Sequence, residues 1–217
     1  MKKIILFMLS LICGLIAHSQ DSKVLIGVEA TPTLAWLHYN PSIGTKDIRI
    51  GFSTGMTFEY IVVPHISIKS GLMYELKGMS TSIELTDESG SPMGNATFKA
   101  NFNYLILPAL ASFSTRGKLK FYINAGPFLG ILIGRKNITS GGSFSPISSD
   151  LYSETKKLDF GISIGPGIYI PLGNKLLFDL GFEENLGLLN TYKGNLNSSN
   201  KVKTNSFGFQ LGLKYKI

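Results

Sequence analysis

Two groups of side chains in this sequence have the types that catalysis uses. His38 lies nine positions before Asp47 in a serine-containing region, and a histidine, an acid and a serine at one place could form a nucleophilic triad. Glu183 and Glu184 are adjacent carboxylates, the groups that acid–base hydrolysis uses. Neighbouring strand residues point to opposite faces, however, and we expect His38 and His65 at connections on opposite rims of the fold. We therefore predict solvated histidines and no catalytic residues.

Metal and phosphate chemistry also have candidates. Asp87, Glu88 and Asp150 could supply oxygen ligands to calcium, but they do not follow the fixed spacing of a calcium loop. The glycine-rich segment 161–167 is followed by no predicted helix whose N-terminus could hold a phosphate. We predict no metal-binding residues, no cofactor-binding residues and no cofactor.

The first residues resemble an export signal. Lys2 and Lys3 precede an apolar run over 4–17, and Ala17 and Ser19 stand where a signal peptidase reads small side chains. We predict a signal peptide over 1–19 and a single domain over 20–217. A membrane anchor and a lipoprotein are the alternatives, but the run is short for a spanning helix and Cys13 follows a bulky isoleucine. Cys13 is the one cysteine, so the mature chain has no disulfide and no thiolate site.

The composition favours β structure in an unusual solvent. Charged residues make up 16% of the 217 residues, against about 25% in a soluble domain. Apolar residues reach 44%, which excludes a disordered chain, and glycine occurs 24 times. The excess of basic over acidic residues is spread along the chain and forms no stripe, so we predict no nucleic-acid binding.

Apolar and polar residues alternate in eight segments, which is the pattern of half-buried strands. The clearest is at the C-terminus, where Phe207, Phe209 and Leu211 alternate with Gly208, Gln210 and Gly212. The fourth segment is expected to present one apolar face, formed by Phe98, Phe102, Tyr104, Ile106 and Leu110, against a polar face of Lys99, Asn101 and Asn103. The eight predicted strands lie within 24–31, 48–60, 66–77, 98–110, 119–131, 158–170, 178–183 and 206–217.

Short and long connections alternate between these segments. Tight turns are expected at 63–65, 114–118 and 172–174, and long loops at 38–47, 86–96, 134–155 and 190–202. An even number of strands with short turns at one rim and long loops at the other is the plan of an up-and-down transmembrane β-barrel. We therefore predict an eight-stranded antiparallel barrel with both termini at the short-turn rim.

The few charges on the polar faces favour a lumen over a water-facing exterior. Those faces consist mainly of Gly, Ser, Asn and Thr, which suit the narrow interior of an eight-stranded barrel. Both signs occur among the charged residues expected to pair inside: Glu29, Arg49, Glu59, Lys69, Glu75, Lys77, Lys99, Lys120, Asp159, Asp179 and Glu183. Aromatic residues are expected at the lipid boundary, with Trp36 and Tyr74 toward the long loops and Tyr60, Phe121 and Tyr215 toward the short turns.

Several motifs occur in an order that resembles the PorT-like outer-membrane β-barrel family. They are Ser70-Gly71-Leu72-Met73-Tyr74-Glu75-Leu76-Lys77-Gly78, Asn103-Tyr104-Leu105-Ile106-Leu107-Pro108, Phe121-Tyr122-Ile123-Asn124-Ala125-Gly126-Pro127, Asp159-Phe160-Gly161 and Gly165-Pro166-Gly167. The resemblance covers nearly the whole mature chain and implies an eight-stranded barrel in the outer membrane of a Gram-negative bacterium. One member of that family is associated with protein secretion, and most relatives have no assigned activity.

We expect a noncatalytic, monomeric outer-membrane barrel with a lumen filled by side chains. Its long loops, chiefly 134–155, are expected to contact a protein partner or ligand, or its body to support an envelope or secretion assembly. The expected surroundings are outer-membrane lipid and, during insertion, the barrel-assembly machinery. A small passive pore, an enzyme at the loop rim and a soluble exported ligand-binding barrel are the alternatives.

Overall fold

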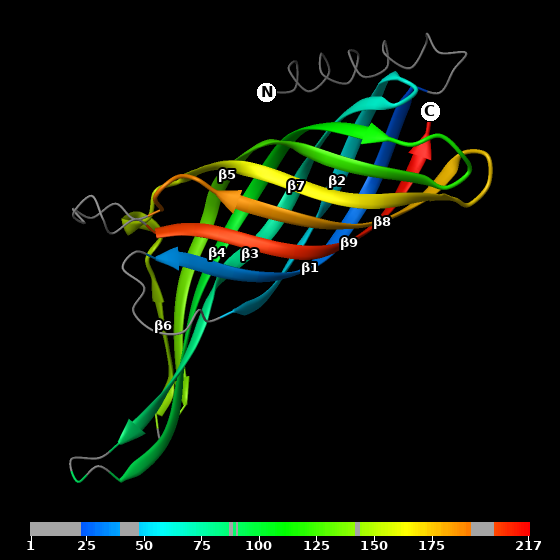
Figure 1. Cartoon of the computed structure of the whole chain (residues 1–217). Coiled ribbons are helices and arrows are strands. Elements are labelled where there is room, and N and C mark those ends of the chain that lie inside the picture. The colour runs from blue at the N-terminus through cyan, green and yellow to red at the C-terminus, as the bar shows by residue number, and fades with distance from the viewer. Residues whose placement is uncertain (1–22, 40–47, 87–88, 90, 142–143, 192–201) are drawn as a thin grey trace, which may run out of the picture.

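The chain forms a β-barrel with an arm that projects from one rim (Figure 1). The computed structural model describes residues 23–39, 48–86, 89, 91–141, 144–191 and 202–217, so the predicted signal peptide lies outside the described residues. The elements are β1 Val24–Tyr39, β2 Arg49–Val63, β3 Ile66–Thr86, β4 Pro92–Ser114, β5 Lys120–Gly141, β6 Phe144–Asp150, a 3-10 turn Tyr152–Glu154, β7 Leu158–Pro171, β8 Leu176–Gly187 and β9 Val202–Lys216.

Eight antiparallel strands close the ring, as predicted. The order is β4-β3-β2-β1-β9-β8-β7-β5, and a further pairing between β4 and β5 completes the circle. β6 pairs with β5 alone and lies outside the ring. Closure leaves no strand edge within the barrel, so its backbone groups are paired without water.

The three short turns lie at one rim, which we call the short-turn rim. They join β2 to β3, β4 to β5 and β7 to β8, at the positions predicted from the sequence. The Ile217 backbone N–H donates to the Val24 carbonyl over 2.9 Å, so the first and last strands meet at this same rim. The opposite end is called the loop rim.

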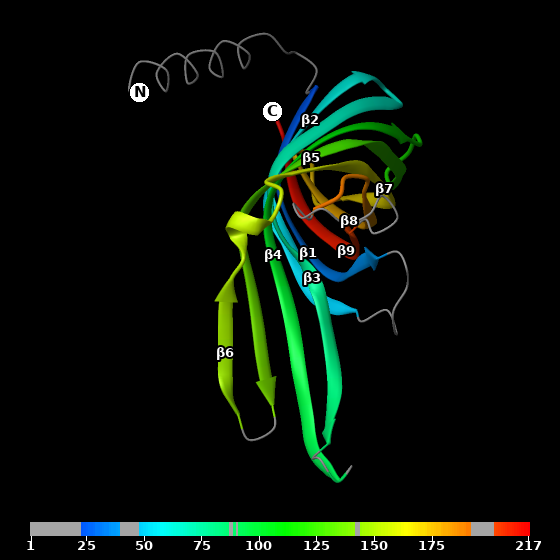
Figure 2. The ribbon, with the colours of Figure 1, turned by 90° about the vertical axis from the view of Figure 1, so that its left-hand side faces the viewer.

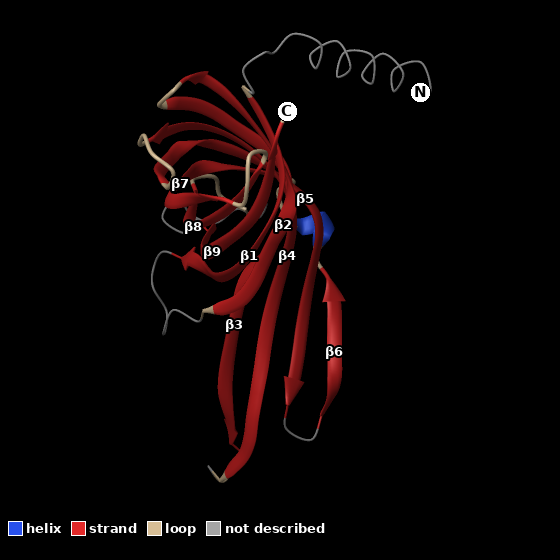
Figure 3. Cartoon of the chain, turned by 90° about the vertical axis from the view of Figure 1, so that its right-hand side faces the viewer, coloured by secondary structure: helices blue, strands red, loops and turns tan. Residues whose placement is uncertain are grey.

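The arm is an extension of β3, β4 and β5, with β6 added (Figures 2 and 3). It comprises residues 78–86, 92–101, 135–141 and 144–150. The prediction of irregular loops over 86–96 and 134–155 was therefore wrong for most of both ranges. Once β3 and β4 pair in the ring, each further residue pair satisfies more backbone groups, and the Ser- and Thr-rich sequence is compatible with a strand exposed to water on both faces.

Apolar side chains point outward from the ring. Phe207, Phe209 and Leu211 are 40%, 41% and 37% exposed, whereas Gln210 between them is 2% exposed. A Cβ added to Gly208 would lie 2.4 Å from Thr31 Cγ2, so this glycine faces a filled interior. An apolar exterior around a polar, crowded lumen contradicts the soluble-barrel alternative. In the described residues, no helix combines the length and apolar character needed to cross a bilayer.

The expected orientation of β4 was wrong. Phe102, Tyr104, Ile106 and Leu110 are buried inside the barrel, and Lys99 is exposed. The outward face of β4 inside the ring carries Leu105, Leu107, Ala109, Ala111 and Phe113, so both faces are apolar. Alternation cannot choose between two apolar faces. The bulkier set fills the lumen, where dense packing replaces a void.

Candidate functional site

Lys214 on β9 is the centre of a buried ionic network in the half of the lumen nearer the short-turn rim. Its Nζ lies 2.9 Å from Glu59 Oε2, 3.3 Å from Asp179 Oδ2 and 3.6 Å from Glu29 Oε1. It also donates to the Tyr169 hydroxyl over 3.0 Å. These four partners lie on β1, β2, β7 and β8, so one ammonium joins strands from both sides of the β1–β9 seam.

Two further lysines extend the network toward the loop rim. Lys69 Nζ lies 2.8 Å from Glu29 Oε1, and Lys77 Nζ lies 3.5 Å from Glu75 Oε2 and 3.8 Å from Asp159 Oδ2. All five side chains are almost completely buried. Hydroxyl groups donate further hydrogen bonds to these carboxylates: Ser206 donates to Glu75 over 2.5 Å and Thr204 donates to Asp159 over 2.7 Å. Buried charges need such partners, because an unpaired one would be costly.

Tyrosines occupy the lumen on the short-turn side of this network. Tyr122 donates to Asp179 over 2.5 Å, and its ring stacks on Tyr169 with centroids 4.4 Å apart. Tyr169 in turn donates to Glu59 over 2.8 Å. Leu25 and Leu177 pack with the two rings as an apolar cluster. Between this cluster and the short-turn rim, a cavity of about 120 Å³ is lined by Glu59, Tyr169, Lys120 and Lys216, among others.

A second apolar cluster fills the loop-side half of the lumen. Its buried members are Met73, Ala100, Phe102, Tyr104, Ile106, Phe128 and Leu132, and Leu37 packs against them. The Lys77 ammonium lies 4.6 Å from the Phe128 ring centroid, which joins this cluster to the ionic network. Between them, a cavity of about 10 Å³ lined by Glu29, Thr57, Lys69 and Glu183 has room for about one water. The lumen is therefore packed in layers along its length.

Seven of the eleven charges expected to pair in the lumen form ion pairs there. They are Glu29, Glu59, Lys69, Glu75, Lys77, Asp159 and Asp179. Glu183 faces the smaller cavity and accepts from Asn185 over 3.0 Å. Lys99 is exposed, so its assignment to the lumen was wrong, while Arg49 and Lys120 are half-buried near the rims.

The residues considered for catalysis do not come together. His38 is exposed near the end of β1 at the loop rim, and Asp47 lies outside the described residues. His65 lies in the β2–β3 turn at the other rim, where its Nδ1 is 2.9 Å from the Ser114 carbonyl and Arg116 Nε donates to its Nε2 over 2.8 Å. Glu184 pairs across the sheet with Phe207, which faces outward, whereas Glu183 faces the lumen, as the strand alternation predicted.

The candidate metal and phosphate segments have structural roles or lie outside the described residues. Asp87 and Glu88 belong to the latter, and Asp150 accepts the Tyr152 backbone N–H over 2.9 Å. No three His, Cys, Asp or Glu side chains among the described residues are placed to share a metal ion. Segment 161–167 is part of β7, where a Cβ on Gly161 would lie 2.1 Å from the Leu186 carbonyl oxygen. Close packing of strands explains this glycine.

The sequence reasoning missed Lys214 and the two lumen tyrosines as the centre of the network. Lys214, Tyr122 and Tyr169 all stand in polar positions of the alternation, so their inward direction was predictable. Their convergence was not, because it depends on the stagger between strands far apart in the sequence.

Comparisons with known proteins match this architecture. Residues 18–193 match the family described as outer membrane protein beta-barrel domain. No curated protein matches the chain. Among solved structures, Neisserial surface protein A is 13% identical, with 90% of this chain and 97% of that chain covered and a TM-score of 0.48. OprG from Pseudomonas aeruginosa is 11% identical, with 90% and 96% covered and a TM-score of 0.41. The outer membrane protease OmpT from Escherichia coli is 10% identical, with 89% and 96% covered and a TM-score of 0.42.

Proposed function

Because this chain belongs to the outer membrane protein beta-barrel domain family, we propose that it is a noncatalytic outer-membrane barrel with a closed lumen, which presents its arm to a protein partner. The packed lumen carries the first half of this proposal. Lys214 and its three carboxylates fill the half nearer the short-turn rim, and Tyr104 and Phe128 fill the loop-side half. An eight-stranded barrel has an interior just wide enough for side chains, so these residues leave little room for an aqueous channel.

Conductance tests closure against the alternative of a small passive pore. The purified protein in planar bilayers is expected to give no stepwise conductance. Replacing two of the three buried aromatic rings of the loop-side cluster, as Tyr104→Ala with Phe128→Ala, should leave the barrel without conductance, because the Lys214 network still closes the lumen. Regular conductance steps from the unaltered protein would overturn the closed lumen in favour of a pore.

The arm supports the second half of the proposal. Past Leu76, β3 pairs with β4 and, among the described residues, with no strand on its other side. An exposed strand edge offers backbone donors and acceptors to which an extended segment of another protein can add. The family's barrels need only the ring to cross a membrane, so a projecting sheet is available for contact outside it.

Cross-linking in intact cells tests the arm as a contact surface. Cys13, the one cysteine, lies in the leader that we propose is removed, so Ser82→Cys on the arm and Lys175→Cys in the β7–β8 turn would each carry a unique thiol. A heterobifunctional reagent is expected to give a discrete higher-mass adduct from position 82 and none from position 175. Adducts from the turn alone, or from neither position, would contradict contact through the arm.

We further infer that the short-turn rim faces the periplasm and that residues 1–19 are removed on export. Support comes from the two barrel ends meeting at that rim and from the sequence of the leader. N-terminal sequencing of the membrane-extracted protein should begin after Ser19. A start at Met1 would contradict the cleavage.

Membership of the PorT-like group, with a role in envelope or secretion assembly, is our finer proposal. Its support is the segment Asn103-Tyr104-Leu105-Ile106-Leu107-Pro108, in which Tyr104 and Ile106 fill the lumen while Leu107 faces outward. Deleting the gene is expected to change the secreted or surface-exposed protein profile. An unchanged profile would count against an assembly role while leaving the barrel itself unaffected.

A further inference from the structure

The short-turn rim carries a group of exposed cations, which we call the collar. Its described members are Lys23, Arg116, Lys118 and Lys175, while the half-buried Lys120 and Lys216 line the lumen cavity at the same rim. The collar residues come from the β4–β5 turn, the β7–β8 turn and the residue before β1, whereas the β2–β3 turn contributes no Lys or Arg. Among the residues whose side chains the structure describes, no Asp or Glu is exposed at this rim, and Glu59, which lines the cavity there, is buried and paired with Lys214.

The arm differs, because its charges are of both signs. Lys99 and Lys136 are exposed there, but so are Glu84 and Asp150. Lys136 and Asp150 are direct cross-strand partners between β5 and β6. The exposed charges of the arm thus offset one another, and the remaining exposed lysines of the loop side in the described chain are Lys156 and Lys157, between β6 and β7.

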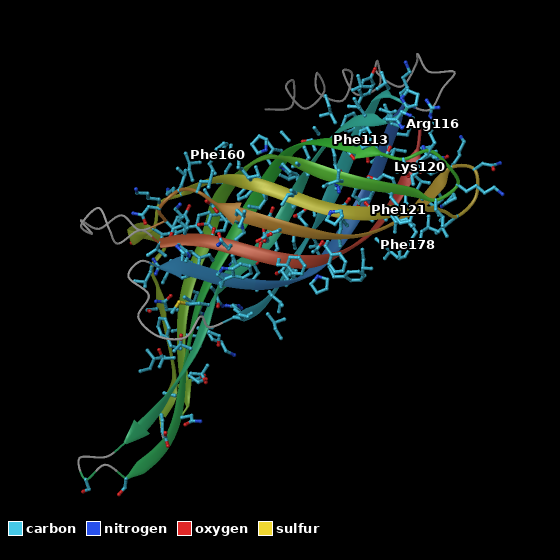
Figure 4. The ribbon with its side chains drawn as sticks, viewed as in Figure 1. Phe113, Arg116, Lys120, Phe121, Phe160 and Phe178 are labelled. Atoms are coloured by element: carbon cyan, nitrogen blue, oxygen red, sulfur yellow. The ribbon has the colours of Figure 1, made fainter. Side chains whose placement is uncertain are left out.

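Outward-facing aromatic residues lie directly beside the collar. Figure 4 shows Phe113, Phe121 and Phe178 at the same end of the barrel as Arg116 and Lys120. Phe113 and Phe121 are 58% and 59% exposed, among the most exposed of the ring's large apolar side chains. Lys175 Nζ lies 5.7 Å from the ring centroid of Tyr215, another outward-facing aromatic residue of this rim. Apolar groups and cations at adjacent depths are the arrangement that matches acyl chains and phosphates.

We propose that the collar binds the phosphates of anionic phospholipids in the leaflet at the short-turn rim, so that anionic lipid gathers around this end of the barrel. The collar continues the lipid-facing surface, which favours a headgroup over a soluble anion or an acidic protein. Identifying that leaflet as the periplasmic one rests on the orientation proposed above. Each cation near an anionic bilayer surface strengthens attraction by about fivefold at low salt, and salt weakens it.

Tryptophan quenching by brominated lipid measures this preference at each rim separately. Trp36, the only tryptophan, lies on β1 near the loop rim and serves as the reporter for that end. The variant Trp36→Phe with Phe121→Trp moves the reporter beside the collar. Both proteins would be reconstituted in dioleoylphosphatidylcholine vesicles that contain either dibrominated phosphatidylglycerol or dibrominated phosphatidylcholine. Equal lipid composition in both leaflets makes the result independent of the direction of insertion.

At position 121 the binding constant for phosphatidylglycerol should exceed that for phosphatidylcholine by at least about threefold, and 0.5 M NaCl should remove most of the difference. The triple variant Arg116→Gln, Lys118→Gln, Lys175→Gln should bring the ratio close to one. The matched loop-side variant Lys99→Gln, Lys136→Gln, Lys156→Gln should leave it unchanged. The salt series needs no change in the collar and therefore holds even if the triple variant folds poorly.

A ratio near one in the unaltered collar, or a preference that survives the triple variant, would overturn the proposal. So would a stronger preference at Trp36 than at position 121. Thiol labelling of Lys175→Cys and Ser148→Cys in intact cells tests the orientation independently. If position 175 were labelled from outside, the periplasmic assignment would fail while the lipid preference measured in vesicles would still stand.

Discussion

Replacing Lys214 with methionine should destabilise the barrel more than any exposed lysine substitution. Methionine nearly keeps the length of the side chain but removes the ammonium that lies within 3.6 Å of Glu59, Asp179 and Glu29. Lys69 still pairs with Glu29, so Glu59 and Asp179 lose their only ion-pair partner among the described residues. Both then keep neutral donors alone: Glu59 accepts from the Ser67 and Tyr169 hydroxyls, and Asp179 accepts from the Tyr122 hydroxyl and the Gln210 amide.

The expected loss in the free energy of unfolding is about 3–5 kcal/mol, the range for removing one partner of a buried ion pair. Lys175→Met is the matched control, because Lys175 is exposed and its contact with the Tyr215 ring is worth about 0.5–1 kcal/mol. The large difference between the two variants follows from desolvation, because a carboxylate buried in the packed lumen cannot be hydrated by water after its ion-pair partner is removed.

Urea unfolding of the protein in phosphatidylcholine vesicles, followed by the fluorescence of Trp36, measures both losses. Adding Glu59→Gln and Asp179→Asn to Lys214→Met should recover at least half of the lost free energy, because no uncompensated carboxylate then remains at the site. A loss below about 1 kcal/mol for Lys214→Met would refute the reasoning, because that is the value of a solvated pair. Failure of the triple variant to recover would show that packing, and not charge, carries the cost.

Two further substitutions test how the ring is built. Gly165→Val should abolish the folded form, which migrates faster than the unfolded one on a gel run without heating, because a Cβ there would lie 1.9 Å from the Phe182 carbonyl oxygen. Gly134→Ala should keep the folded form, because the nearest atom to a Cβ there is the Asn103 side-chain nitrogen at 3.3 Å. Equal behaviour of the two would contradict the tight strand packing. Phe209→Arg should cost about 2–4 kcal/mol in vesicle unfolding if that face meets hydrocarbon, and Ile147→Arg on the arm should change stability by less than about 0.5 kcal/mol. A neutral Phe209→Arg would place that face outside the bilayer.

Much of the ring could be predicted from the sequence because one physical rule repeats in nearly every strand. On β9, large apolar side chains alternate with Gly, Gln and Lys. Only one orientation of the two faces places the apolar side chains against lipid and the small or polar ones in the lumen. The same rule predicted that Glu183 and Glu184 would separate. Turn positions followed from Gly, Pro and Asn at the short connections.

The errors arose where the alternation of apolar and polar residues does not distinguish one structure from another. On β4 both faces are apolar, so the inward direction of Tyr104 depends on which set fills the lumen beside Phe128. The arm escaped prediction because Ser, Thr and Asn suit a loop and an exposed strand equally well. The ionic network depends on barrel stagger, which brings Lys214 to Glu59 across 155 positions of sequence. No local pattern carries that information.

Relaxation of side-chain nuclear spins by a lipid-soluble radical tests the central claim on the unaltered protein. With a doxyl-labelled fatty acid in the membrane mimic, the methyl groups of Leu211 and Leu213 should broaden strongly, while the side-chain signals of Gln210 and Lys214 should remain sharp. This alternation would show hydrocarbon outside the ring and the polar network within it. Broadening of Gln210 and Lys214 with protection of the leucine methyls would contradict the account.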